Sequence, residues 1–270
     1  MTATTTRCAV LGDPVEHSLS PALHRAAYAT LGLGEWSYDA VRVPSGALAD
    51  FLDGLGEEWR GLSLTMPLKR ELLALAVERG WECSPRAHAA GGANTLVRER
   101  TGWRADNTDL PGAVAAVRER YAGPVDRVLV LGGGATAASV ALALCDLGAT
   151  RVDLLVRSVE RAQESVDTIR SHRSRPEVRA FTRPAGAAHV LVSTVPPAAQ
   201  DAGLLGASGA GLLFEALYDP WPTPLAAAAL ERRLPLVSGL DLLVHQAALQ
   251  VEQFTGRAVP VEVQIGRAHV

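Results

Sequence analysis

The sequence predicts an α/β fold in which the second half of the chain forms a doubly wound parallel sheet. Apolar runs of strand length alternate with amphipathic stretches along the 270 residues, and this alternation is typical of parallel sheets. The apolar run 127–131 leads through three glycines into a helical stretch, and the next apolar run follows at 152–156. This is the spacing of a βαβ unit. Hydrophobic residues make up 48% of the chain and aromatic residues only 5%, so we expect a core of Ala, Val and Leu.

The first half is expected to alternate strands and helices. Strands are predicted at residues 8–11, 38–43, 62–64 and 94–98. Ser20 precedes Pro21, a pattern typical of an N-cap followed by the first helical residue. Further helices are expected from a cap at Ser45 to about residue 55, directly after Lys69, and from Asp109 to about residue 121.

A boundary between the halves is expected at residues 122–124, where glycine and proline meet. After it, strands are predicted at residues 127–131, 152–156, 190–193, 212–216 and 236–237. Four arginines are expected to decorate a solvated loop: Arg173, Arg175, Arg179 and Arg183.

Composition and charge exclude several classes of protein. A net charge of −3 gives no electrostatic footprint for nucleic acid or an anionic membrane. The three cysteines, Cys8, Cys83 and Cys145, form no CxxC pair, so neither a disulfide framework nor a metal site is indicated. No apolar run approaches the roughly 18 residues of a membrane helix. We therefore expect a cytoplasmic protein.

Lys69 is the only lysine in the chain, since 26 Lys plus Arg less one Lys leaves 25 Arg. Arginine stays protonated in proteins, whereas a lysine can lose its proton when its surroundings favour the neutral amine. Lys69 also follows Thr65 and Pro67 at a strand-to-helix junction, where active sites are common. General acid/base chemistry explains the exception; a surface lysine that arose by drift is the alternative.

The three glycines at 132–134 predict a nucleotide site. Glycine allows a tight turn and a close approach of the backbone to a pyrophosphate at the start of the following helix. Ala137 stands where the dinucleotide fingerprint has its third glycine. The alternative is a turn with a structural role only.

The residues after the second strand favour NADP over NAD. NAD-binding proteins place an acidic residue there for the ribose hydroxyls, but this chain has Arg157 and Ser158. A guanidinium at this position pairs with a 2′-phosphate, and the serine adds a hydroxyl donor. A surface arginine is the alternative.

Several separated segments together resemble one known family. The matching segments are residues 12–24 (GDPVEHSLSPALH), 64–69 (LTMPLK), 92–95 (GANT), 107–109 (NTD), 132–137 (GGGATA), 156–158 (VRS) and 243–248 (LVHQAA). They resemble the motifs of the shikimate dehydrogenases, and the match spans nearly the whole chain.

The resemblance implies a role for each matching residue. Lys69 and Asp109 would be catalytic. Substrate binding would fall to Ser18, Ser20, Thr65, Asn94, Asp109, Tyr218 and Gln246. NADP binding would fall to Gly132, Gly133, Gly134, Ala135, Thr136, Arg157, Ser158 and Gly239. The reaction implied is the reversible, NADP-dependent reduction of 3-dehydroshikimate to shikimate. Three positions depart from the family pattern without removing a reacting group: Arg25, Val156 and Leu242.

The resemblance also implies two domains. Residues 1–108 would form a substrate-binding α/β domain, joined by a returning helix at 240–264. Residues 109–239 would form a Rossmann-type NADP domain. Residues 265–270 (IGRAHV) are expected to be a non-native tail.

Two other functions remain open at this point. One is an NAD-preferring quinate or quinate/shikimate dehydrogenase, which Arg157 and the serines at 18 and 20 disfavour. The other is a non-catalytic ligand-binding homologue, which would have lost Lys69 or Asp109. Apart from the small-molecule substrate, the expected state is a monomer or homodimer.

Overall fold

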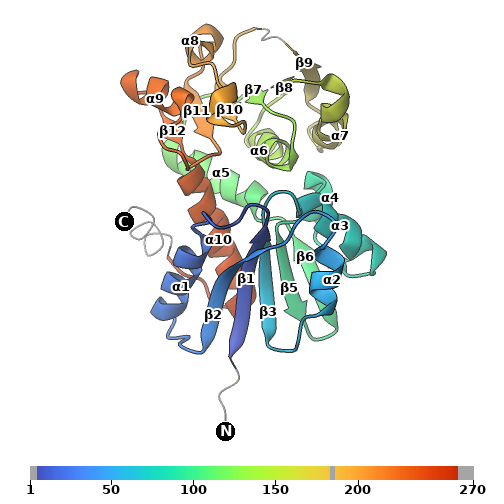
Figure 1. Cartoon of the computed structure of the whole chain (residues 1–270). Helices are drawn as coiled ribbons and strands as arrows, with labels where there is room; N and C mark the ends of the chain where they lie inside the picture. The colour runs from blue at the N-terminus through green and yellow to red at the C-terminus, as the bar shows by residue number, and fades with distance from the viewer. Residues whose placement is uncertain (1–4, 183–185, 261–270) are drawn as a thin grey trace. The chain divides into compact units, whose positions relative to one another are not determined.

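The computed structural model describes residues 5–182 and 186–260, which fold into two compact units (Figure 1). Unit 1 comprises residues 1–108 and 244–270, and unit 2 comprises residues 109–243. The predicted tail at 265–270 and Arg183 lie outside the described residues. The predicted α/β fold is confirmed.

Unit 1 is built on a mixed six-stranded sheet of order β2-β1-β3-β5-β6-β4. Its strands are β1 (Thr6–Gly12), β2 (Trp36–Arg42), β3 (Trp59–Leu64), β4 (Glu82–Cys83), β5 (Thr95–Glu99) and β6 (Gly102–Asp106). Its helices are α1 (Ser20–Thr30), α2 (Leu48–Asp53), α3 (Lys69–Glu78), α4 (Pro85–Ala90) and most of α10 (Gly239–Thr255). β5 runs antiparallel to β3 and to β6.

The two faces of this sheet follow from the alternation of side chains along each strand. Ala9 and Leu11 of β1 pack into one core with α2, α3 and α4. Cys8 and Val10 pack into the other core with α1 and α10. The unit therefore has three layers.

α10 belongs to unit 1 because it packs directly on the sheet. A Cβ built at Gly61 in β3 would overlap the ring of Phe254, and Phe254 is 1% exposed. The absence of a side chain at position 61 of β3 therefore leaves room for this helix. α10 spans Gly239–Thr255 and not the predicted 240–264, and its first five residues group with unit 2.

Unit 2 has a fully parallel sheet of order β12-β11-β10-β7-β8-β9. Its strands are β7 (Arg127–Leu131), β8 (Arg151–Leu155), β9 (Glu177–Phe181), β10 (Val190–Ser193), β11 (Leu212–Glu215) and β12 (Leu236–Val237). Its helices are α5 (Asp109–Arg120), α6 (Ala135–Asp146), α7 (Val159–Arg170), the 3-10 turn η1 (Pro197–Ala199), α8 (Gly203–Ser208) and α9 (Pro224–Glu231). Counted from β7, this is the 3-2-1-4-5-6 order of a Rossmann sheet.

Four local predictions were wrong. The boundary between the units falls between residues 108 and 109 and not at 122–124. Ser20 is not a cap, because α1 begins at Ser20 itself after Leu19 and no side chain caps it. The second helix is shorter than predicted and is preceded by Ala47 rather than capped by Ser45. Arg179 lies in strand β9 and not in a loop, and it pairs with Asp153 at 3.1 Å.

Candidate active site

Backbone hydrogen bonds gather the predicted substrate segments of unit 1 at one edge of its sheet. The Thr65 N–H donates to the Leu11 carbonyl (2.9 Å) and the Leu64 N–H to the Asn94 carbonyl (2.8 Å). The Asn94 N–H donates to the Asp106 carbonyl (3.0 Å). The ends of β1, β3 and β6 therefore meet the start of the antiparallel β5. Ligands of open α/β sheets bind at the carboxyl ends of strands, so this edge is the candidate site of unit 1.

Lys69 is the first residue of α3 and is half-buried. Its carbonyl accepts from the Ala93 N–H at 2.8 Å. A Cβ built at Gly92 would lie 3.3 Å from that same carbonyl. The start of α3 is thus fastened to the segment that carries Asn94.

Gly12 brings the loop after β1 against the Thr65 turn. A Cβ at Gly12 would overlap the Thr65 side chain and lie 2.9 Å from the Met66 carbonyl oxygen. The same loop carries Ser18 and leads into α1 at Ser20, whose N–H donates to Ser18 Oγ at 3.3 Å. Because Ser20 caps no helix, its buried hydroxyl is not committed to that role.

Asn94 and Gln246 are brought together from distant parts of the sequence. Asn94 Nδ2 donates to Gln246 Oε1 at 3.3 Å, and the Thr108 N–H donates to Asn94 Oδ1 at 2.8 Å. Asn94 is 2% and Gln246 7% exposed. Both predicted amides therefore belong to one buried polar cluster.

In unit 2 the glycine turn between β7 and α6 is closed on one side and open on the other. Gly132 has a φ of +112°, and a Cβ there would overlap the Thr194 hydroxyl. By contrast, no described atom lies within 4 Å of a Cβ built at Gly134. Gly134 precedes Ala135 and Thr136, the first residues of a helix 12 residues long. Such a helix start attracts anions, and Thr194 follows β10, where the strand order reverses.

Arg157 and Ser158 follow β8, the neighbour of β7. Arg157 is exposed, and within the described part of the chain it has no hydrogen bond or ion pair. Ser158 has a structural role: its Oγ accepts from the Arg161 N–H (3.3 Å) as the N-cap of α7 and donates to Glu160 (2.7 Å). The guanidinium is thus available to an anion, whereas the serine hydroxyl is already engaged.

Gly239 and Tyr218 lie on segments in close contact. A Cβ built at Gly239 would lie 2.5 Å from the Ala216 carbonyl oxygen, so the segment leading to Tyr218 passes directly over the start of α10. Glu215 holds this segment, because its Oε1 accepts from the Leu217 N–H at 3.2 Å. Tyr218 is half-buried.

The predicted residues divide between the units. Unit 1 carries Ser18, Ser20, Thr65, Lys69, Asn94 and Gln246, and unit 2 carries Asp109, Tyr218, Gly239 and the glycine turn with residues 157–158. Asp109 is the first residue of α5 and is 4% exposed. The partnership of Lys69 with Asp109 stays a prediction.

Sequence reasoning missed two buried polar residues beside the predicted site. Gln250 contacts Asn94, and Glu215 holds the Tyr218 segment. Gln250 follows Gln246 by four residues on α10, a spacing that places both on one helix face and was a usable signal. Glu215 ends an apolar strand, and nothing in its sequence context distinguishes it.

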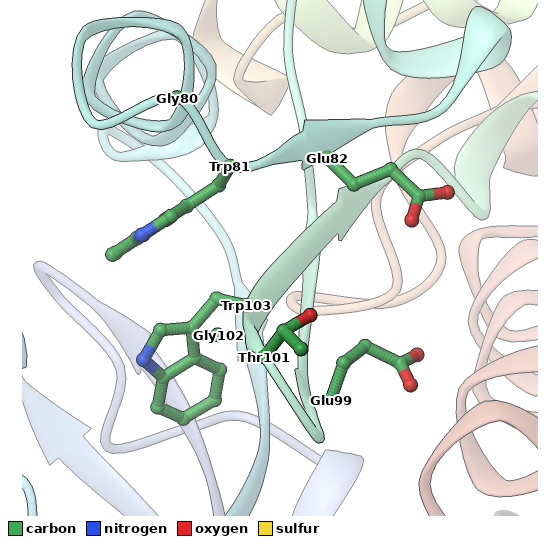
Figure 2. Close-up of a pocket in the computed structure, with 7 residues that line it drawn as sticks. All are labelled: Gly80, Trp81, Glu82, Glu99, Thr101, Gly102 and Trp103. Carbon is green, nitrogen blue, oxygen red and sulfur yellow. The ribbon is translucent and has the colours of Figure 1, made fainter.

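A shallow hollow elsewhere in unit 1 contains none of the predicted residues (Figure 2). It has a volume of about 320 Å³ and is lined by Gly80, Trp81, Glu82, Glu99, Thr101, Gly102 and Trp103. Figure 2 shows the two indoles on one side of the strands and the two carboxylates on the other. Because these side chains do not converge, the hollow is not a candidate catalytic site.

Among the described residues, no group of three or more His, Cys, Asp or Glu side chains is able to hold a metal ion. Over the same residues, no helix is long and apolar enough to cross a membrane.

Comparisons with known proteins agree over nearly the whole chain. Residues 10–96 match the family model of the shikimate dehydrogenase substrate binding domain, and residues 239–263 match that of the shikimate 5′-dehydrogenase C-terminal domain. A shikimate dehydrogenase (NADP(+)) of Methylobacterium radiotolerans is 36% identical, with 95% of this chain and 93% of the relative covered.

Solved structures agree with these matches. The crystal structure of Mycobacterium tuberculosis shikimate dehydrogenase superposes with a TM-score of 0.85 at 40% identity, covering 98% of each chain. The shikimate 5-dehydrogenase of Thermus thermophilus, solved in complex with NADP(H) and shikimate, gives a TM-score of 0.83 at 31% identity over 98% of each chain.

Proposed function

Because the chain belongs to the shikimate dehydrogenase family, we propose that it catalyses the NADP-dependent, reversible reduction of 3-dehydroshikimate to shikimate. Its relatives bear out the predicted oxidoreductase class and the predicted cofactor. The observation that carries the proposal is that the predicted residues follow the carboxyl-end edge of each sheet, with most substrate residues in unit 1 and the cofactor residues in unit 2.

The reaction needs a hydride and a proton. When bound, NADPH would supply the hydride to the carbonyl carbon. The Lys69 ammonium gives its proton to the carbonyl oxygen, and in the reverse direction the neutral amine takes the proton of the shikimate hydroxyl. Asp109 accepts a hydrogen bond from this amine and orients it. No metal is required, since the charge that develops on oxygen is neutralised by the proton.

The residues of unit 2 fit the cofactor. The space above Gly134 and the N-terminus of α6 suit a pyrophosphate. The exposed Arg157 suits the 2′-phosphate, whereas the engaged Ser158 contributes mainly by holding α7 in place. Gly239 would lie on the nicotinamide side, and its lack of a side chain allows the Ala216 carbonyl to pass close to the start of α10.

The residues of unit 1 fit a polyhydroxylated carboxylate. Neutral donors and acceptors suit such a substrate, and they are offered by Ser18, Ser20, Thr65, Asn94 and Gln246, with Tyr218 from unit 2. The buried Asn94–Gln246 pair gives this set a fixed part.

Steady-state assays of nicotinamide absorbance test the proposal, using shikimate or quinate, each with NADP or NAD. We expect the highest kcat/KM for shikimate with NADP. Higher kcat/KM for quinate with NAD would favour the quinate dehydrogenase alternative. No turnover with any of the four pairs would leave only the non-catalytic alternative.

We further propose a cytoplasmic location and a monomeric or homodimeric state. All three cysteines are unpaired, which suits a reducing compartment. Sedimentation of the purified protein would reveal a larger assembly.

A further inference from the structure

We propose that Gln250 is a positioning residue that acts through Thr95 to fix which way the amide of Asn94 faces. Asn94 in turn sets the orientation of Gln246. The inference rests on the proposed function, which assigns Asn94 and Gln246 to the substrate. All four residues lie in unit 1.

Gln250 has a single amide orientation that satisfies its partners. It is 1% exposed on α10. Its Nε2 donates to the Asn94 carbonyl oxygen at 3.2 Å, and a carbonyl oxygen only accepts. The other end, Oε1, accepts from Ser63 Oγ at 2.8 Å, and Ser63 Oγ accepts from the Tyr38 hydroxyl at 2.7 Å.

This orientation determines what the Thr95 hydroxyl does. Thr95 Oγ1 accepts from Gln250 Nε2 at 3.0 Å. Its one proton then goes to Asn94 Oδ1 at 2.8 Å. The Thr108 N–H, which only donates, reaches the same Oδ1 at 2.8 Å. The oxygen of the Asn94 amide is therefore held from two directions.

The Asn94 nitrogen consequently faces Gln246. Asn94 Nδ2 donates to Gln246 Oε1 at 3.3 Å. Thr108 Oγ1 lies 3.1 Å from Asn94 Oδ1 and 3.4 Å from Gln246 Oε1, and its one proton goes to the nearer oxygen, that of Asn94. Gln246 Nε2, itself a donor, must then face away from Asn94 Nδ2. A chain of donors runs from Tyr38 to Gln246 and ends in N–H groups, which suit the oxygen of a substrate hydroxyl.

The chain of hydrogen bonds carries no charge. His24 lies beside it, with Nε2 3.4 Å from Gln250 Oε1 and its ring stacked on Tyr38 at 3.9 Å. Burial lowers the pKa of His24 to about 3, so the ring is neutral near pH 7. Protonation of His24 therefore does not disturb the donor order near pH 7.

Kinetics of the full chain test this role against a matched control on the same helix. Gln253 lies three residues beyond Gln250, but it donates to Asp106 (2.8 Å) and not to the chain of hydrogen bonds. We expect Gln250→Leu to raise the KM for shikimate about tenfold, the scale of one lost hydrogen bond. Gln253→Leu should leave it within about twofold, and neither variant should change the Kd for NADP.

A second pair of variants guards against loss of folding in Gln250→Leu. Thr95→Val keeps the shape but has no proton to donate, whereas Thr95→Ser keeps the hydroxyl. We expect the valine variant to reproduce the higher KM and the serine variant to restore it. In the double variant the effects of Gln250→Leu and Thr95→Val should not add, because both break the same chain.

The outcomes distinguish failure of the proposed function from failure of the positioning role of Gln250. No turnover by the wild type overturns the proposed function and, with it, the role of these amides. Normal wild-type turnover with an equal rise in KM for Gln250→Leu and Gln253→Leu, or for Thr95→Ser and Thr95→Val, overturns the positioning role alone.

Discussion

The carboxyl ends of the two sheets hold their polar groups in different ways. In unit 1, Asn94 and Gln246 are buried and hydrogen-bonded directly to one another. In unit 2, the glycine turn offers backbone and open space, and Arg157 is exposed without an ion pair among the described residues. Unit 1 should therefore be sensitive to lost hydrogen bonds, and unit 2 to added volume or lost charge.

Two buried carboxylates, one in each unit, also differ, because their pKa values shift in opposite directions. Burial disfavours ionisation of Asp106 in unit 1, but hydrogen bonds from Arg86 and Ser84 outweigh it and hold its pKa below the ordinary value. In unit 2, burial raises the pKa of Glu215. Its partners are neutral donors, among them Thr223 at 2.7 Å, and they do not offset the loss of water.

The largest effect is expected at Lys69. Lys69→Ala should lower kcat by about 10²–10⁴, the usual scale of general acid/base catalysis. Lys69→Arg should not restore it, because a guanidinium does not release its proton. The Kd for NADP should stay unchanged, since the predicted cofactor residues lie in unit 2. Single-turnover rates and NADP titrations measure the two effects separately, and near-normal turnover by the arginine variant would contradict the proton-transfer role.

The glycine turn should respond to added volume and, at Gly132, to its positive φ. Gly134→Ala adds a methyl group where no described atom lies within 4 Å, so folding should be normal while NADP affinity falls roughly tenfold, if the space belongs to the pyrophosphate. Gly132→Ala should lose both affinity and stability, because of its φ of +112° and the overlap with Thr194. Calorimetric titration and thermal unfolding distinguish the two variants. Unchanged NADP affinity in Gly134→Ala would place the cofactor elsewhere.

Much of this architecture could be predicted from local sequence. The glycine turn, the strand at 127–131 and the start of a helix near Lys69 depend on short-range patterns. Strand β9 was missed because Arg179 reads as a solvent residue, although Asp153 on the neighbouring strand neutralises it. The missing information was a cross-strand partner 26 residues away.

A site residue could be predicted where its amino-acid type is unusual in the sequence. It could not be predicted where its role arises only from contacts made when it is buried. The single lysine marked Lys69 from composition alone. Gln250 is an ordinary helical residue until α10 packs against β3 and brings it to Ser63 and Thr95. The four-residue spacing from Gln246 predicts that the two glutamines share a helix face, but the contacts with Ser63 and Thr95 depend on the return of the chain from a distant part of the sequence.

Arg157 tests whether charge in unit 2 selects the cofactor. Arg157→Gln should raise the KM for NADP about tenfold and leave that for NAD nearly unchanged, since only NADP carries the 2′-phosphate. The wild-type preference for NADP should also weaken as the salt concentration rises, because the guanidinium is exposed.

Ser158→Ala is the matched comparison. It removes the N-cap of α7 and should cost about 1 kcal/mol of stability with a smaller change in cofactor preference. Equal losses for both cofactors in Arg157→Gln would contradict the assignment.

The buried carboxylates give the most specific test, because their stability contributions should change with pH in opposite directions. Asp106 has a folded pKa below its ordinary 3.8, so its contribution is complete above pH 3.8 and is lost as pH falls through the folded value. Asp106→Asn should therefore destabilise by about 2 kcal/mol at pH 7, and this deficit should shrink only in acid.

Glu215 has a folded pKa above its ordinary 4.5. Its contribution is complete below pH 4.5 and is lost as pH rises through the folded value. Relative to the wild type, Glu215→Gln should therefore gain stability between pH 4.5 and neutral pH, whatever its absolute stability. Urea unfolding across this range, with hydrogen exchange to assign each loss to a unit, measures both slopes. If the unfolding free energies of the two variants, relative to the wild type, changed with pH in the same direction, a cationic partner and neutral partners would have the same effect on the pKa of a buried carboxylate. The contrast between the units would then not hold.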